Sequence, residues 1–136
     1  MLVRWSSGVR ILIVDDEVRI RVGIARVLSR RGFMLDQAAN AAESRELLST
    51  RQYDAVLLDW QLPDGTGIDL CPFIREVQPI AHVIMLTGRD DPADRLRAFD
   101  AGADDFVCKQ SIDVEEIGAR LRAVARRRTT TSPKSA

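Results

Sequence analysis

The stretch Ala55–Gly65, AVLLDWQLPDG, decides the fold. Four apolar residues run directly into an aspartate, Asp59, and a turn rich in proline and glycine follows. A continuous apolar run bounded by turn signals is typical of a strand that is buried on both faces, as in a parallel sheet. Open α/β folds place their functional sites where such strands end. The stretch therefore predicts a buried strand whose terminal carboxylate, Asp59, carries the chemistry of the protein.

On either side of this stretch, apolar strands alternate with helical patterns. The predicted strands are residues 10–14, 33–38, 55–58, 82–86 and 104–108, and the second is the least apolar, as an edge strand would be. A helix over residues 18–31 carries one apolar stripe and stops at Gly32. The alternation predicts an α/β fold: a doubly wound, five-stranded parallel sheet in the order 2-1-3-4-5, with right-handed crossovers and helices on both faces.

Capping signals predict the starts of three further helices, at Asn40, Asp91 and Asp113. The helix between the third and fourth strands has two possible starts. If Thr66 is the N-cap, Pro72 lies in the helix interior and removes a hydrogen bond. If Asp69 is the N-cap, Pro72 falls in the first turn, where proline is tolerated. We expect a ragged start or a kink in this helix.

The composition is that of one globular domain. The 136 residues are 46% hydrophobic and 29% charged, which is ordinary for such a domain. We expect a flexible lead over residues 1–8, the domain over 9–128 and a linker-like tail over 129–136. The last eleven residues carry a formal charge of +4, so residues 1–125 carry −4. A phosphate-tracking surface should be basic, so direct nucleic-acid binding by the domain is not expected.

Targeting signals and metal-binding motifs of zinc type are missing from the sequence. No apolar run exceeds four residues, so neither a transmembrane segment nor a signal peptide is predicted, and we expect a cytoplasmic protein. Cys71 and Cys108 form no CxxC pair, and His82 is the only histidine. A zinc-type cluster is therefore not predicted, and both cysteines are expected to be reduced.

Residues of catalytic type follow four of the five predicted strands: Asp15 with Asp16, then Asp59, Thr87 and Lys109. Because the carboxyl ends of parallel strands lie on one edge of the sheet, these side chains can converge. Carboxylates that share a pocket repel one another unless they are protonated or bound to a cation, and their oxygens suit Mg²⁺. A lysine and a hydroxyl suit phosphoryl oxygens. The pattern predicts magnesium-assisted formation of an aspartyl phosphate.

These motifs resemble those of the response-regulator receiver domains of two-component signalling. The resemblance covers about residues 9–128 and rests on VDDE at 14–17, LLDWQLPDGTG at 57–67, LTGRDD at 86–91 and AGADDFVCK at 101–109. It implies the flavodoxin-like (βα)5 form of the fold. It also implies a phosphorylation-activated switch, not an enzyme acting on other substrates. A sensor histidine kinase or a phosphotransfer protein would supply the phosphoryl group, and the domain would catalyse its own phosphorylation and dephosphorylation.

The resemblance also assigns the metal site. Asp59 would accept the phosphoryl group and would bind Mg²⁺ directly, together with Asp16. Asp15 would bind the ion through water, and the backbone carbonyl of Gln61 would complete the protein ligands. Gln61 and Arg89 lie two residues after the phosphoacceptor and after the switch threonine, respectively. We expect both to tune how long the phosphate lasts.

Switching would involve a second group of residues. Lys109 would pair with the phosphoryl group, Thr87 would move to meet it, and Phe106 stands at the position of the switch aromatic. The change would pass to the face made by the fourth helix, the fifth strand and the fifth helix. Trp60 is expected to be a partly exposed loop residue and a fluorescence reporter.

The partners of the domain are open at this point. A set of charged residues is most simply solvated, and its alternative role is to pair phosphorylated receivers as homodimers: Asp104, Asp105, Glu116, Arg120 and Arg127. The tail could lead into a C-terminal effector domain outside this chain, for example a DNA-binding one, or it could be the true end.

The sequence departs from the family's pattern after Lys109, and two other function classes fit its motifs less well. Gln110 stands where the family usually has proline, and a cis bond before a non-proline residue costs ~2.5–4 kcal/mol, so a trans Lys109–Gln110 bond is predicted. A phosphohydrolase resembling the haloacid dehalogenases would need an acid at Gln61, which is an amide. A phosphorylation-independent interaction module would not need the complete set Asp15, Asp16, Asp59, Thr87 and Lys109.

Overall fold

The structure is a computed structural model that describes residues 8–88 and 91–131. The elements follow in the order β1 (Arg10–Val14), α1 (Val18–Arg30), β2 (Met34–Ala38), α2 (Ala41–Thr50), β3 (Ala55–Asp59), β4 (Gln61–Leu62), β5 (Gly65–Thr66), α3 (Gly67–Val77), β6 (His82–Thr87), α4 (Pro92–Ala101), β7 (Asp105–Cys108), a 3₁₀ turn (Lys109–Ser111) and α5 (Val114–Thr131).

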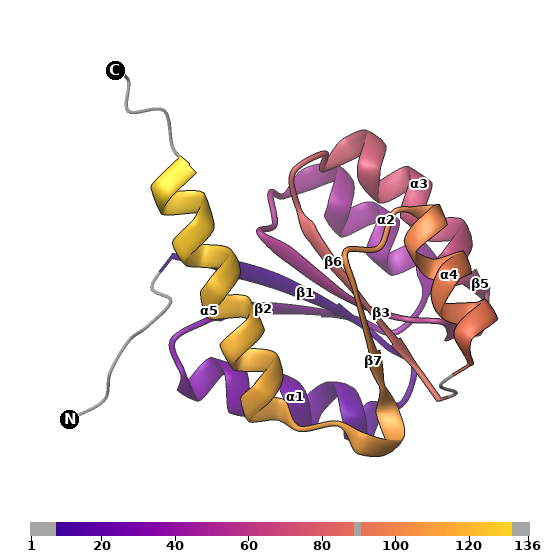
Figure 1. The fold of residues 1–136 in the computed structure, drawn as a ribbon, viewed down its shortest axis with the longest axis horizontal. Coiled ribbons are helices and arrows are strands. Elements are labelled where there is room, and N and C mark those ends of the chain that lie inside the picture. The colour runs from indigo at the N-terminus through magenta and orange to yellow at the C-terminus, as the bar shows by residue number, and fades with distance from the viewer. Residues whose placement is uncertain (1–7, 89–90, 132–136) are drawn as a thin grey trace.

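Five of these strands form one parallel sheet in the order β2-β1-β3-β6-β7 (Figure 1). This is the predicted doubly wound order, and β2 lies at an edge as expected. The strand that decides the fold, β3, is central and fully buried, with β1 and β6 as its neighbours. The short antiparallel pair β4–β5 was not predicted; it pairs Gln61 with Thr66 and Leu62 with Gly65.

Helices cover both faces of the sheet (Figure 1). The helices α1 and α5 lie on one face, and α2, α3 and α4 lie on the other. Alternate residues of β1 enter the two cores: Ile11 and Ile13 pack with α1 and α5, whereas Leu12 and Val14 pack on the opposite side. A strand with apolar side chains on both faces can be buried only between two layers, which is why these strands read as continuous apolar runs.

The predicted caps are present. Asn40 accepts a hydrogen bond from Glu43 N (2.8 Å), Asp91 from Ala93 N (2.8 Å) and Asp113 from Glu115 N (3.0 Å).

Helix α3 settles the question of its start. The hydroxyl of Thr66 accepts a hydrogen bond from Asp69 N at 3.1 Å, and the helix is continuous from Gly67 to Val77 with Pro72 inside it. Of the two expectations, the ragged start is therefore wrong, and a kink at Pro72 stays a prediction. Thr66 is favoured because its side chain satisfies one of the free N–H groups of the first turn.

At the C-terminal end, α5 continues to Thr131, three residues into the segment that was expected to be a linker. The Lys109–Gln110 bond is trans, as predicted, since the described residues contain no cis peptide. Across the described ranges, no helix is both long and apolar enough to cross a membrane. The flexible lead, except Gly8, and the last five residues of the tail lie outside the described residues.

Candidate functional site

The predicted site residues gather at one edge of the sheet because each follows or ends a parallel strand. Asp15 comes directly after β1, Asp59 ends β3, Thr87 ends β6 and Lys109 comes directly after β7. Asp15 is 0% exposed, and Asp59 and Thr87 are 4% exposed. Three polar side chains buried at the end of an apolar sheet are costly to desolvate, which points to a functional role for them.

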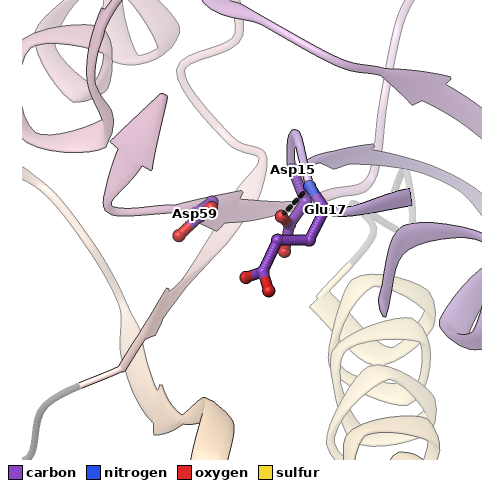
Figure 2. Close-up of side chains that lie close together, drawn as sticks. All are labelled: Asp15, Glu17 and Asp59. Carbon is purple, nitrogen blue, oxygen red and sulfur yellow. Dashed lines mark hydrogen bonds between the residues drawn. The ribbon is translucent and has the colours of Figure 1, made fainter. Parts of the chain in front are cut away.

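Lys109 joins these strands through three carboxylates. Its Nζ lies 2.6 Å from Glu17 Oε1, 2.8 Å from Asp15 Oδ2 and 3.1 Å from Asp59 Oδ2. Figure 2 shows the three carboxyl groups turned toward the same space from β1, from the start of α1 and from β3. The ammonium therefore neutralises part of an acidic cluster that would otherwise repel itself.

The electrostatics of the pair Asp59 and Lys109 are strongly perturbed. The pKa of Asp59 is raised from 3.8 to about 7, first by burial and then by the nearby charge of Asp15, and the contacts with Lys109 oppose this rise. For Lys109, burial alone would lower the pKa, but its contacts with Asp15, Glu17 and Asp59 outweigh this effect and raise it. At neutral pH, Lys109 is charged and Asp59 is poised between its two protonation states.

The acidic cluster fits a divalent cation. One oxygen each of Asp15, Glu17 and Asp59 lie within 4.8 Å of one another. Asp15 Oδ1 accepts the Glu17 N–H (2.9 Å), whereas the buried Oδ2 has an ion pair with Lys109 but no hydrogen bond of suitable geometry in the described part of the chain. Carboxylate oxygens gathered in this way are hard ligands of the kind that Mg²⁺ accepts, together with water and phosphate oxygens.

A pocket of about 400 Å³ opens over this cluster, and its lining residues are Asp16, Glu17, Asp59, Gln61, Leu62, Pro63, Gly88 and Lys109. Asp16 is exposed and is not part of the close carboxylate cluster, although it lines the pocket. The backbone N–H of Gln61 donates to Asp59 Oδ1 at 3.3 Å, and the Gln61 side chain is exposed. The volume is that of a small-ligand site, and the described acids, lysine and backbone groups converge on it.

The loop after Asp59 is fixed at two points. The carboxylate of Asp64 accepts hydrogen bonds from Ala41 N (2.7 Å) and Ala42 N (3.0 Å), so it caps the start of α2. These hydrogen bonds lower the pKa of Asp64. At Gly67, an added Cβ would lie 2.5 Å from the backbone oxygen of Asp59, so only glycine allows the loop to return this closely to β3.

Two aromatic residues connect the site to α4. Trp60 is only 8% exposed, so the expectation of a partly exposed residue is wrong; the Arg97 guanidinium lies over its ring, 5.5 Å from the centroid. Arg95 lies over the ring of Phe106 on β7 at 5.4 Å. Phe106 is half-buried. Both contacts are cation–π pairs; one ties α4 to β7, and the other ties it to the residue that follows β3.

The charged residues suggested as a dimer face have partners within the chain. Arg120 pairs with Asp105 and, at 2.7 Å, with Glu116. Asp104 pairs with Arg75 and accepts the Val83 N–H. Arg127 is exposed. A role of these groups in dimerisation stays a prediction.

Glu17 is the site residue that sequence reasoning missed. It belongs to the quoted VDDE motif, but it was assigned no role because it lies one residue beyond the paired aspartates. The available signal was its place in the short connection after the first strand, from which its side chain can reach the same edge as Lys109. Arg89, predicted to tune the lifetime of the phosphate, lies outside the described residues.

Residues 11–122 match the response regulator receiver domain family. The chain belongs to this family. Its members are phosphoacceptor regulatory domains of two-component signalling, they bind Mg²⁺ at an acidic pocket, and they are partnered with histidine kinases.

Individual relatives agree with the family assignment. The chain is 39% identical over 121 residues to the transcriptional regulatory protein TcrA of Mycobacterium tuberculosis, covering 89% of this chain and 47% of TcrA. It is 37% identical to the transcriptional regulatory protein ResD of Bacillus subtilis, covering 93% of this chain and 52% of ResD. The chain thus spans about half the length of the curated relatives it matches.

Solved structures agree on the fold. A CheY-like receiver domain of Methanospirillum hungatei superposes with a TM-score of 0.86 at 25% identity, covering 93% of this chain and 100% of that one. A response regulator of Burkholderia pseudomallei with a phosphorylated aspartic acid and a calcium ion gives a TM-score of 0.80 at 28% identity, covering 94% of this chain and 75% of that one.

Proposed function

We propose that this domain is a magnesium-dependent switch that accepts a phosphoryl group on Asp59. The observation that carries the proposal is the convergence of Lys109 on Asp59 and Asp15 in a pocket at the sheet edge. A carboxylate beside an ammonium and an acidic, cation-fitting cluster can attack phosphorus while the developing charge is stabilised. The phosphorylated aspartate in the Burkholderia pseudomallei relative supports the same chemistry.

Each site residue would have a distinct role in phosphoryl transfer. Asp59, in its deprotonated form, attacks the phosphorus of a phosphohistidine; an oxygen–phosphorus bond forms, the phosphorus–nitrogen bond breaks, and the leaving imidazole takes a proton. Lys109 holds one phosphoryl oxygen and the hydroxyl of Thr87 holds another. Asp15, Asp16, Asp59 and the carbonyl of Gln61 would hold Mg²⁺, which neutralises phosphoryl charge when it is bound.

The output would pass through α4, β7 and α5. Phosphorylation adds charge at the end of β3, next to Trp60, and the contacts of Trp60 with Arg97 and of Phe106 with Arg95 link this edge to α4. The Arg120–Asp105 pair links β7 to α5. A local charge change can bias such a set of contacts between two arrangements.

The partners of the whole protein belong to the same proposal. We propose a sensor histidine kinase or a phosphotransfer protein as the phosphodonor, a cytoplasmic location, and an effector domain after α5. The names of TcrA and ResD as transcriptional regulatory proteins favour an effector that binds DNA. A phosphorylation-dependent homodimer is the form in which such an effector could be regulated.

The test uses Trp60 as a reporter in a Trp5→Phe background, because the chain contains two tryptophans. Mg²⁺ with beryllofluoride, which mimics a bound phosphoryl group, should change Trp60 fluorescence in a saturable way. Acetyl phosphate with Mg²⁺ should add one phosphoryl group per chain, measured by intact mass. Asp59→Asn should abolish both results. A wild-type protein that neither responds nor gains mass would refute the proposal, and sustained turnover of a phosphate monoester would favour a hydrolase.

A further inference from the structure

The start of α1 has an unusual N-cap. Glu17 occupies the N-cap position with an extended backbone, but its side chain makes no capping hydrogen bond. Ser, Thr, Asp and Asn are the residues favoured there because their short side chains reach the free N–H groups of the first turn. Glu17 instead extends away from its own helix, and its Oε1 lies 2.6 Å from Lys109 Nζ. The Glu17 side chain therefore contacts the site and does not cap its own helix.

The ammonium of Lys109 forms ion pairs with three carboxylates in this state, and its contact with Glu17 is a hydrogen bond as well. It has three N–H donors and faces three carboxylate oxygens, one each from Asp15, Glu17 and Asp59. A phosphoryl group on Asp59 would require at least one of these donors. In that state Asp59 is an acyl phosphate and no longer a carboxylate, so the competition for Lys109 lies between the phosphoryl oxygens and the carboxylates of Asp15 and Glu17.

Glu17 is the carboxylate that can leave at the lowest cost. Its side chain is 56% exposed, whereas that of Asp15 is 0% exposed and that of Asp59 is 6% exposed. An exposed carboxylate regains water when it leaves an ion pair, whereas a buried one is left with an uncompensated charge. The three contacts are therefore unequal: the Glu17 contact is the shortest, yet it is the one that costs least to release because its carboxylate is exposed.

From this asymmetry we propose that Glu17 is a positioning residue that holds Lys109 in the unphosphorylated protein and competes with the phosphoryl group for it. The inference rests on the proposed function, since the competition matters only if Asp59 is phosphorylated. Glu17 then sets how readily the switch is turned on: the contact must break during activation, and it forms again when the phosphate is lost.

The first experiment measures the affinity for beryllofluoride at saturating Mg²⁺. Glu17→Gln keeps the shape and removes the charge, so Lys109 is released more easily and the affinity should rise about two- to fivefold, the range expected for an exposed ion pair. Glu17→Asp keeps the charge but is one methylene shorter, so the affinity should rise here too. Glu46→Gln, an exposed position on α2 that does not line the pocket, should behave like wild type.

The two Glu17 variants distinguish a direct contact between Glu17 and Lys109 from a long-range effect of the Glu17 charge on the site. If Glu17→Gln binds more tightly but Glu17→Asp matches wild type, the charge acts through space and the proposal is overturned. It is also overturned if neither variant differs from wild type.

A second experiment tests the contact without metal or phosphate. In EDTA, the effect of Glu17→Gln on the urea midpoint of unfolding should disappear in a Lys109→Met background, because the two side chains act as a pair. An equal effect in both backgrounds would refute the contact. This cycle stays informative even if wild type fails to respond to beryllofluoride, a result that would instead refute the proposed function.

Discussion

Lys109 Nζ lies 3.1 Å from Asp59 Oδ2 although β7 and β3, which position the two residues, are separated in the sheet by β6. The long lysine side chain spans the end of β6 and brings a positive charge to the phosphoacceptor. This contact opposes the rise in the pKa of Asp59 that burial and Asp15 cause, and it supplies the counter-charge of the acidic cluster.

Removing the charge of Asp59 should stabilise the metal-free protein at alkaline pH. The folded-state pKa of about 7 lies above the unfolded value of about 3.9, so the folded state binds this proton more tightly. The stability from this group is fully present below pH ~4 and is lost as the pH rises through ~7. Asp59→Asn should therefore raise the free energy of unfolding by about 1–3 kcal/mol at pH 8, after allowance for screening by water, and the gain should shrink toward pH 4.

Urea unfolding in EDTA across this pH range measures the effect. Asp100→Asn, at an exposed position on α4, removes the same formal charge and should show no comparable gain. A pH-independent effect of Asp59→Asn would contradict the assigned pKa.

Removing Lys109 should leave the acidic cluster without its counter-charge. Lys109→Met at pH 8 in EDTA should lower the free energy of unfolding by about 2–4 kcal/mol. The Lys109 side chain is only 9% exposed, and without its ammonium the three carboxylates keep their negative charges without a counter-charge. Mg²⁺ should restore part of the loss, since a cation can replace the ammonium. Arg19→Met on the exposed surface of α1 is the matched control. If Mg²⁺ stabilises Lys109→Met no more than wild type, the cluster is not a cation site.

Much of the fold and of the site could be predicted from local signals. The apolar run before Asp59 predicted a buried parallel strand. Because the carboxyl ends of parallel strands lie on one edge of the sheet, Asp15, Thr87 and Lys109 were predicted to lie beside Asp59. The contact of Glu17 depends on the path of a flexible side chain between two elements, which no periodicity encodes. The burial of Trp60 could not be predicted from its local sequence because Trp60 belongs to a core cluster assembled from elements far apart in the chain.

Gln78 should stabilise the face opposite α1 without affecting the switch. Its buried amide donates to Leu48 O at 2.9 Å and accepts the Tyr53 N–H at 3.0 Å, so it joins the end of α3 to the α2–β3 connection. Gln78→Ala should cost about 2–4 kcal/mol of unfolding free energy, because it leaves buried backbone groups unsatisfied and opens a cavity. Urea unfolding measures this cost, and Gln52→Ala, at an exposed position, should be near neutral. Loss of beryllofluoride binding by folded Gln78→Ala would show that the residue also supports the site.

Gly67 should be essential for the position of the phosphoacceptor. A Cβ at this residue would lie 2.5 Å from Asp59 O and 3.0 Å from Met85 Sδ, and the first of these atoms is backbone that can yield only by moving the end of β3. Gly67→Ala should therefore destabilise the protein by about 1–3 kcal/mol and weaken beryllofluoride binding at saturating Mg²⁺. Gly23→Ala is the matched control: its Cβ meets nothing within 4 Å in the interior of α1, and it should stabilise the protein by about 0.5–1 kcal/mol with unchanged binding. If both alanine variants bind the analogue like wild type, the close approach at Gly67 does not position Asp59.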